Sequence, residues 1–81
     1  MEKKTMRLKD ASNYVISRLT QNQAAKVLGI TPNQVYKYAT GYTKTCSDKV
    51  IDAFYDKFDI YIEGQYNSEE EYLKFRKLRE E

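Results

Sequence analysis

Apolar residues recur every three or four positions along most of this chain, and that spacing places their side chains on one face of an α-helix. The sequence contains only one proline and three glycines. Long β-meanders need more turn residues than that. The pattern predicts five short helices, from Leu8 to about Leu19, from Gln21 to Leu28, from Pro32 to about Thr40, from Asp48 to about Phe58, and from Glu69 onwards.

Helix-capping residues precede three of these segments. In a capping box, a Ser or Thr side chain and a Glu or Gln three positions later each hydrogen-bond the other residue's backbone N–H. Pro32 suits the first position of its helix, where a missing N–H loses no hydrogen bond. Gly29 follows the second helix, where a glycine with positive φ can end the helix and turn the chain. The capping pairs are Thr20–Gln23, Thr31–Gln34 and Ser68–Glu71.

One stretch departs from helical spacing. Ile60, Tyr61 and Ile62 favour extended backbone, and Gly64 interrupts the run, so we expect a short strand or extended segment near residues 59–66. Residues 1–6 read as a frayed arm. The predicted fold is mainly all-α: one domain over residues 1–81, built as a compact bundle of about five short helices with this extended segment.

The available residue types exclude several kinds of chemistry. The chain has no histidine and Cys46 is its only cysteine, which argues against a zinc site and an internal disulfide. Without imidazole, and without carboxylates grouped in an apolar setting, we expect neither an enzyme nor a cofactor. No apolar run is long enough for a signal peptide or a membrane span, and a lone thiol suits a reducing cytoplasm.

The net charge of +2 conceals an asymmetry. Residues 1–44 carry eight Lys or Arg and two acids, whereas residues 45–81 carry six Lys or Arg and ten acids. No Asp or Glu occurs between Ala11 and Ser47. A surface without carboxylates does not repel phosphates, so this window favours a polyanionic partner.

The acid-free window contains the pattern of a helix-turn-helix from Gln21 to Thr40. With its capping residue Thr20, the core motif covers residues 20–40. Such a motif needs a small residue where the two helices cross and a turn residue that tolerates positive φ. Ala25 and Gly29 fill these two places. Apolar residues must then lock the helices together, and they are Ala24, Leu28, Ile30, Val35 and Tyr38.

The segment TQNQAAKVLGITPNQVYKYATG resembles the helix-turn-helix of the phage repressor and Cro-type family of bacterial regulators. The likeness covers about a quarter of the chain. It implies that Gln21, which opens the second helix, binds a DNA backbone phosphate. It also implies that the start and outer face of the third helix read bases, at Thr31, Pro32, Asn33, Tyr36 and Lys37. The end of that helix and the following loop would contact phosphates, at Thr40, Tyr42 and Lys44.

Pro32 departs from the family, in which many members have a polar base-reading residue at that position. Asn33 and Lys37 are therefore the better readers, because Asn can pair with adenine and Lys can donate to guanine O6 and N7. Alternatives remain open from the sequence. Asn33 could serve only the helix cap, Tyr36 could fold back onto the protein, and Lys37 and Lys44 could be merely solvated.

These patterns predict a double-stranded DNA-binding transcriptional regulator, more readily a repressor than an activator, of phage, plasmid or bacterial origin. It would bind an operator as a homodimer, with the third helix in the major groove. The acidic, aromatic region over residues 59–81 would form the dimer. An alternative is an autoregulating interaction module, an antitoxin or inhibitor, that binds another protein through this region. The predicted dimer residues are Ile60, Ile62, Tyr72, Phe75 and Leu78.

Overall fold

A computed structural model of the chain describes residues 3–80, and it confirms the predicted mainly α-helical bundle. Each predicted helix is present within a residue or two of its expected bounds. The bundle also contains one small parallel sheet of two strands. In chain order the elements are β1 (Lys4–Met6), α1 (Leu8–Arg18), α2 (Gln21–Leu28), α3 (Pro32–Thr40), α4 (Asp48–Phe58), β2 (Ile60–Ile62) and α5 (Glu69–Glu80).

Strand β2 is the extended segment that the sequence predicts, but the expectation of a frayed N-terminal arm is wrong for residues 3–6. Lys4–Met6 form β1, which pairs in parallel with β2, so that Thr5 lies opposite Tyr61. The Lys4 N–H also donates to the Asp59 carbonyl at 2.9 Å. Three residues are too few for a periodic signal, so only the pairing partner reveals this strand. Residues 1 and 2 of the predicted arm lie outside the described residues.

The three predicted caps are present. Thr20 and Gln23 form a complete capping box, with bonds of 3.1 and 3.2 Å. The hydroxyl groups of Thr31 and Ser68 accept the N–H three residues on, which is half of a box. Satisfying these N–H groups fixes where α2, α3 and α5 begin.

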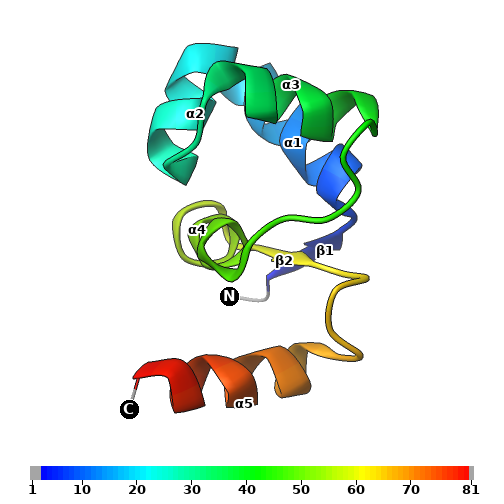
Figure 1. The fold of residues 1–81 in the computed structure, drawn as a ribbon, viewed down its shortest axis with the longest axis vertical. Helices are drawn as coiled ribbons and strands as arrows, with labels where there is room; N and C mark the ends of the chain where they lie inside the picture. The colour runs from blue at the N-terminus through cyan, green and yellow to red at the C-terminus, as the bar shows by residue number, and fades with distance from the viewer. Residues whose placement is uncertain (1–2, 81) are drawn as a thin grey trace.

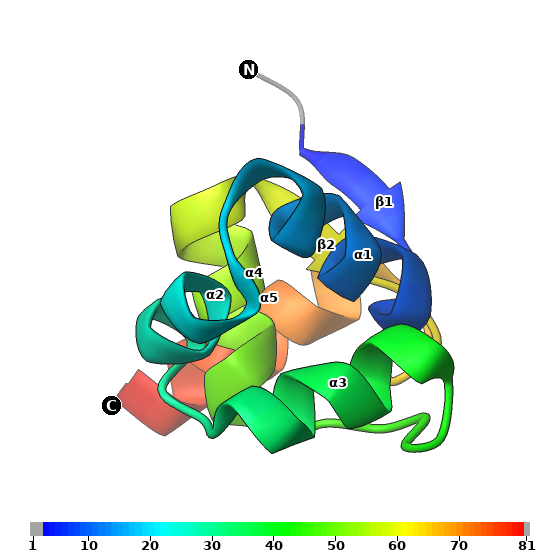
Figure 2. The ribbon, with the colours of Figure 1, turned by 90° about the horizontal axis from the view of Figure 1, so that it is seen from above.

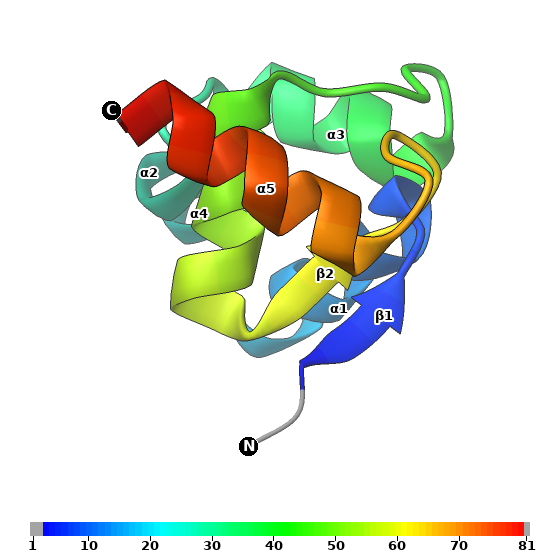
Figure 3. The same cartoon turned by 90° about the horizontal axis from the view of Figure 1, so that it is seen from below.

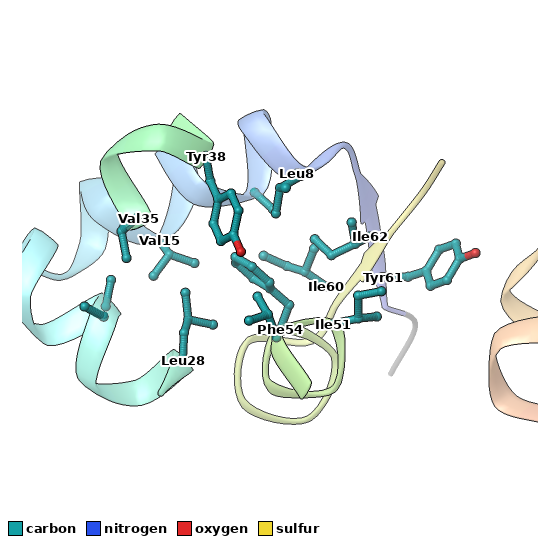
Figure 4. Packing of buried hydrophobic residues seen from close by; sticks show 14 of the residues in the cluster. Leu8, Val15, Leu28, Val35, Tyr38, Ile51, Phe54, Ile60, Tyr61 and Ile62 are labelled. Carbon is teal, nitrogen blue, oxygen red and sulfur yellow. The ribbon is translucent and has the colours of Figure 1, made fainter. Parts of the chain in front are cut away.

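The elements stack in three tiers along the longest axis of the molecule (Figure 1). Helices α1, α2 and α3 form one end, α4 and the two strands form the middle, and α5 forms the other end. The apolar core lies between the first two tiers, and Figure 4 shows Tyr38 reaching from α3 toward Phe54 of α4. Ile60 and Ile62 enter the same core from β2, and every one of these side chains is buried.

The contact between α4, β2 and α5 has a different chemistry. Tyr61 points to the face of β2 opposite Ile60 and Ile62, as strand alternation requires (Figure 4). Its ring centroid lies 5.8 Å from that of Tyr72 on α5. Tyr55 and Tyr66 also pack on Tyr72, at 5.2 and 5.4 Å between centroids. Helix α5 lies across α4 and β2 (Figure 3), and these ring contacts form an aromatic layer that holds it there.

This packing corrects the predicted dimer surface. Ile60, Ile62 and Tyr72 are each 0% exposed within a single chain, so they have no surface to offer a second copy. The amphipathic pattern of α5 correctly indicates that Tyr72 makes an apolar contact, but Tyr72 makes it with tyrosines of its own chain. Phe75 and Leu78 do remain exposed, at 44% and 58%.

Three aspartates of α4 face α5, because residues four apart lie on one side of a helix. Asp56 pairs with the Arg76 guanidinium at 2.5 Å. Asp52 accepts from the Tyr72 hydroxyl at 2.5 Å and pairs with Arg79 at 3.2 Å. Asp48, the third, accepts from the Tyr66 hydroxyl at 2.6 Å. We call these three residues the aspartate row.

The aspartate row makes the fold sensitive to acid. Burial of Asp52 disfavours its charged form, but hydrogen bonds from Arg79 and Tyr72 outweigh burial, so the pKa of Asp52 lies below its usual value. A carboxyl whose pKa is lower in the folded state stabilises the fold above its unfolded pKa. That contribution is lost as the pH falls through the folded pKa.

We therefore expect the free energy of unfolding to fall as the pH is lowered from ~5 to ~2, and Asp52→Asn to flatten this dependence. Urea denaturation followed by circular dichroism at a series of pH values measures it. Asp10→Asn is the control, because Asp10 is exposed on α1. An equal pH dependence in Asp52→Asn and the native chain would contradict the assignment.

Candidate nucleic-acid interface

Helices α2 and α3 form the predicted helix-turn-helix. Gly29 has φ = 74°, the left-handed conformation that glycine adopts without strain, and there it ends α2. The next N–H, that of Ile30, donates to the Ala25 carbonyl at 3.0 Å and closes the turn. The Gln21 side chain donates to the Pro32 carbonyl at 2.8 Å, joining the first turns of the two helices. Figure 2 shows α3 along one edge of the molecule, with α1 and α2 beside it.

The side of α3 away from the core carries most of the predicted base-reading residues. The buried side is held by Val35 and Tyr38, as the motif requires. The Tyr36 side chain is 56% exposed, so it does not fold back onto the protein. Lys37 is half-buried beside the helix end. Fully on the exposed side are Thr31, Pro32, Asn33, Tyr36 and Thr40.

The predicted phosphate contacts fall into two groups with different surroundings. Tyr42, which is 81% exposed, and Lys44 project from the loop between α3 and α4. The Lys37 ammonium lies 6.0 Å from the Tyr42 ring centroid. In the second group, Gln21 and Thr40, each side chain already donates a hydrogen bond to a backbone carbonyl of the protein. Gln21 bonds Pro32, and the Thr40 hydroxyl donates to the Tyr36 carbonyl at 3.0 Å.

Two further lysines, Lys9 and Lys49, lie beside Gly41 and Gly29, near the ends of α3. Lys49 of α4 runs past the turn: a Cβ placed on Gly29 would lie 3.7 Å from its Cε atom. Lys9 of α1 lies beside Gly41, where a Cβ would be 3.4 Å from its Cδ atom. Both come from helices outside the motif. Their position follows from the packing of α1 on α3 and of α4 on α2, and the motif contains neither α1 nor α4.

Most carboxylates of the neighbouring elements bind residues away from α3, and Asp10 of α1, next to Lys9, is exposed. The aspartate row of α4 points to α5, and Glu63 lies 3.6 Å from Arg7. Asp59 pairs with Lys3 at 2.9 Å. No Asp or Glu occurs in α2, α3 or the loop as far as Ser47. The surface formed by α2, α3 and the loop after them therefore carries lysines and no carboxylate.

Cys46, the single cysteine of the sequence, is half-buried. Burial raises the pKa of the Cys46 thiol to about 12, and the charge of Asp48 adds to this effect. A thiol held protonated in this way is a poor nucleophile and metal ligand. Within residues 3–80 there is no group of three or more metal-ligating side chains. None of the helices described there has the length and apolar character needed to cross a membrane.

The chain matches no protein-family model, no curated protein and no solved structure.

The cap of α3 can be tested without any ligand. Thr31→Ala removes the acceptor for the Gln34 N–H and should lower the free energy of unfolding by about 1 kcal/mol. Thr40→Ala is the matched control, since its hydroxyl only bonds carbonyls of its own helix, and it should stay within about 0.5 kcal/mol of the native chain. Chemical denaturation measures both, and equal losses would argue against the cap.

Proposed function

We propose that the protein is a sequence-specific, double-stranded DNA-binding regulator that inserts α3 into the major groove. The observation that carries the proposal is the exposed side of α3. It is polar, lysines adjoin it, and α2, α3 and the loop after them contain no carboxylate. A helix of this kind, supported from behind by a second helix, is the usual reading element of helix-turn-helix proteins.

Within this proposal, base readout falls to Asn33 and Lys37. The Asn33 amide is exposed in the first turn of α3, where side chains of a recognition helix reach base edges. It can pair with adenine N6 and N7, while a Lys can donate to guanine. Pro32 has no side-chain donor and contributes at most apolar contact. Thr31 and Tyr36 adjoin the same surface.

Phosphate contact falls to the two ends of the helix. Lys44 and Tyr42 extend from the loop after α3, and Lys9 and Lys49 lie beside Gly41 and Gly29. Gln21 keeps a second amide N–H for phosphate, because its bond to Pro32 uses only one. Such contacts set the register on the duplex and make affinity depend on salt.

Selection of bound duplexes from a random pool tests this function. With the selected site, Asn33→Ala should weaken binding by about 1–3 kcal/mol and relax specificity at one base pair. Lys37→Ala should do the same at another. Lys77→Ala, an equal loss of charge on α5 at the other end of the molecule, is the control. Fluorescence anisotropy measures the affinities, and unchanged binding by both α3 variants would refute this reading face.

A regulator of this size gains specificity by binding as a homodimer, because one helix reads only ~4–6 base pairs and two half-sites double that. The exposed part of the predicted dimer surface is a shallow groove of about 430 Å³. It is lined by Asp48, Tyr66, Phe75, Leu78 and Arg79. This groove also favours the second candidate, an interaction module that holds another protein there. We place either form in the cytoplasm and favour repression, since a bound domain this small can act by occluding polymerase.

Sedimentation at micromolar concentration separates the two. A homodimer should dissociate to monomers in Leu78→Glu, whereas Leu73→Glu should leave it intact, because Leu73 is exposed on α5 but does not line the groove. A native chain that sediments as a stable monomer would favour the interaction module instead.

A further inference from the structure

The loop between α3 and α4 carries Tyr42 and Lys44, two of the proposed phosphate contacts, and it is held at two points. At its start, the Thr43 N–H donates to the Lys37 carbonyl at 3.2 Å, which extends the end of α3. At its end, Cys46 is bound by the side chain of Gln65. Lys44 lies between these two points.

Gln65 holds Cys46 through both backbone groups. Its Oε1 accepts from the Cys46 N–H at 2.5 Å, and its Nε2 donates to the Cys46 carbonyl at 2.8 Å. A primary amide is the side chain that offers one acceptor and donors together, so it can pair with a residue's N–H and C=O at once. Both residues are half-buried, where a lost partner is harder for water to replace.

The Cys46 side chain packs against the apolar core, whereas the residues just before it border open space. A hollow of about 850 Å³ opens between the loop and the connection from β2 to α5. Its walls include Thr43, Lys44 and Thr45 on one side and Gly64 and Gln65 on the other. Without the bonds of Gln65, the loop therefore has room to move away from its present position.

We propose that Gln65 is a positioning residue for DNA binding: it holds Cys46 and thereby orders the phosphate-contacting segment 42–44. This inference rests on the proposed function. It makes the connection from β2 to α5, which belongs to the other end of the fold, part of the DNA-binding machinery. The next residue, Tyr66, binds Asp48 of α4, so the docking of α5 and the position of the loop share one short segment.

Gln65→Met tests the proposal, because Met has a similar volume and neither an amide donor nor an amide acceptor. We expect the selected DNA to bind about 5- to 10-fold more weakly, as expected for the loss of one or two net hydrogen bonds. The slope of log affinity against log salt should decrease by up to about one, because Lys44 is no longer held at its phosphate. Lys44→Ala should cost less affinity in Gln65→Met than in the native chain, since the two changes remove one shared contact.

Ser68→Ala is the matched control. It removes a hydrogen bond from the same connection, that between the Ser68 hydroxyl and the Glu71 N–H, and leaves the bonds to Cys46 in place. It should leave both the salt slope and the effect of Lys44→Ala unchanged. Amide hydrogen exchange provides a readout without DNA: the Cys46 N–H should exchange faster in Gln65→Met and at the native rate in Ser68→Ala.

The outcomes distinguish a failure of the proposed DNA-binding function from a failure of the role of Gln65. If no DNA is selected by the native chain, the proposed function fails, and the role of Gln65 in it fails as well. If DNA is selected but Gln65→Met binds with native affinity and salt slope, only the role of Gln65 is overturned. Equal effects of Gln65→Met and Ser68→Ala on the salt slope would also overturn it, since both would then act through general stability.

Discussion

Phe54 of α4 is buried in the apolar core, where Tyr38 of α3 reaches toward it, and this burial fixes the rotation of α4 about its own axis. The rest of the arrangement depends on that rotation. Since residues four apart share a helix face, orienting the apolar side of α4 toward the core, beside α2 and β2, turns Asp48, Asp52 and Asp56 toward α5. The apolar contact is the stronger constraint, because each large side chain buried there contributes about 1.5–3 kcal/mol, whereas partly exposed ion pairs contribute less.

This division separates the charges of the molecule. The carboxylates of α4 are used by arginines and tyrosines of the C-terminal tier, where burial and the bond to Asp52 raise the pKa of Tyr72 and keep its hydroxyl a donor. Helices α2 and α3 and the loop after them keep their lysines and carry no acids. A small domain can in this way hold its last helix with acidic residues and still present a surface suited to phosphate. The same constraint thus supports both the stability of α5 and the proposed DNA-binding surface.

The local elements could be predicted because their signals are local. Caps at Thr20 and Thr31, the glycine at position 29 and helical spacing of apolar residues act over three or four positions, and the structure places α2 and α3 accordingly. The exposed position of Asn33 and the burial of Tyr38 follow from the same periodicity. The sequence predicts Ile60, Ile62 and Tyr72 at a dimer interface, but they are buried within one chain. An apolar pattern indicates that a side chain is buried and does not indicate which element covers it.

The sequence by itself determined the helices, the turn between α2 and α3, and the absence of acids from that stretch, since all three are properties of neighbouring residues. Only the tertiary structure decided the pairing of β1 with β2, the burial of the tyrosines under α5, and the bonds from Gln65 to Cys46, nineteen residues away. These contacts join segments distant in sequence, and no spacing rule encodes them. They depend on how α4 packs, which requires the whole core to be present.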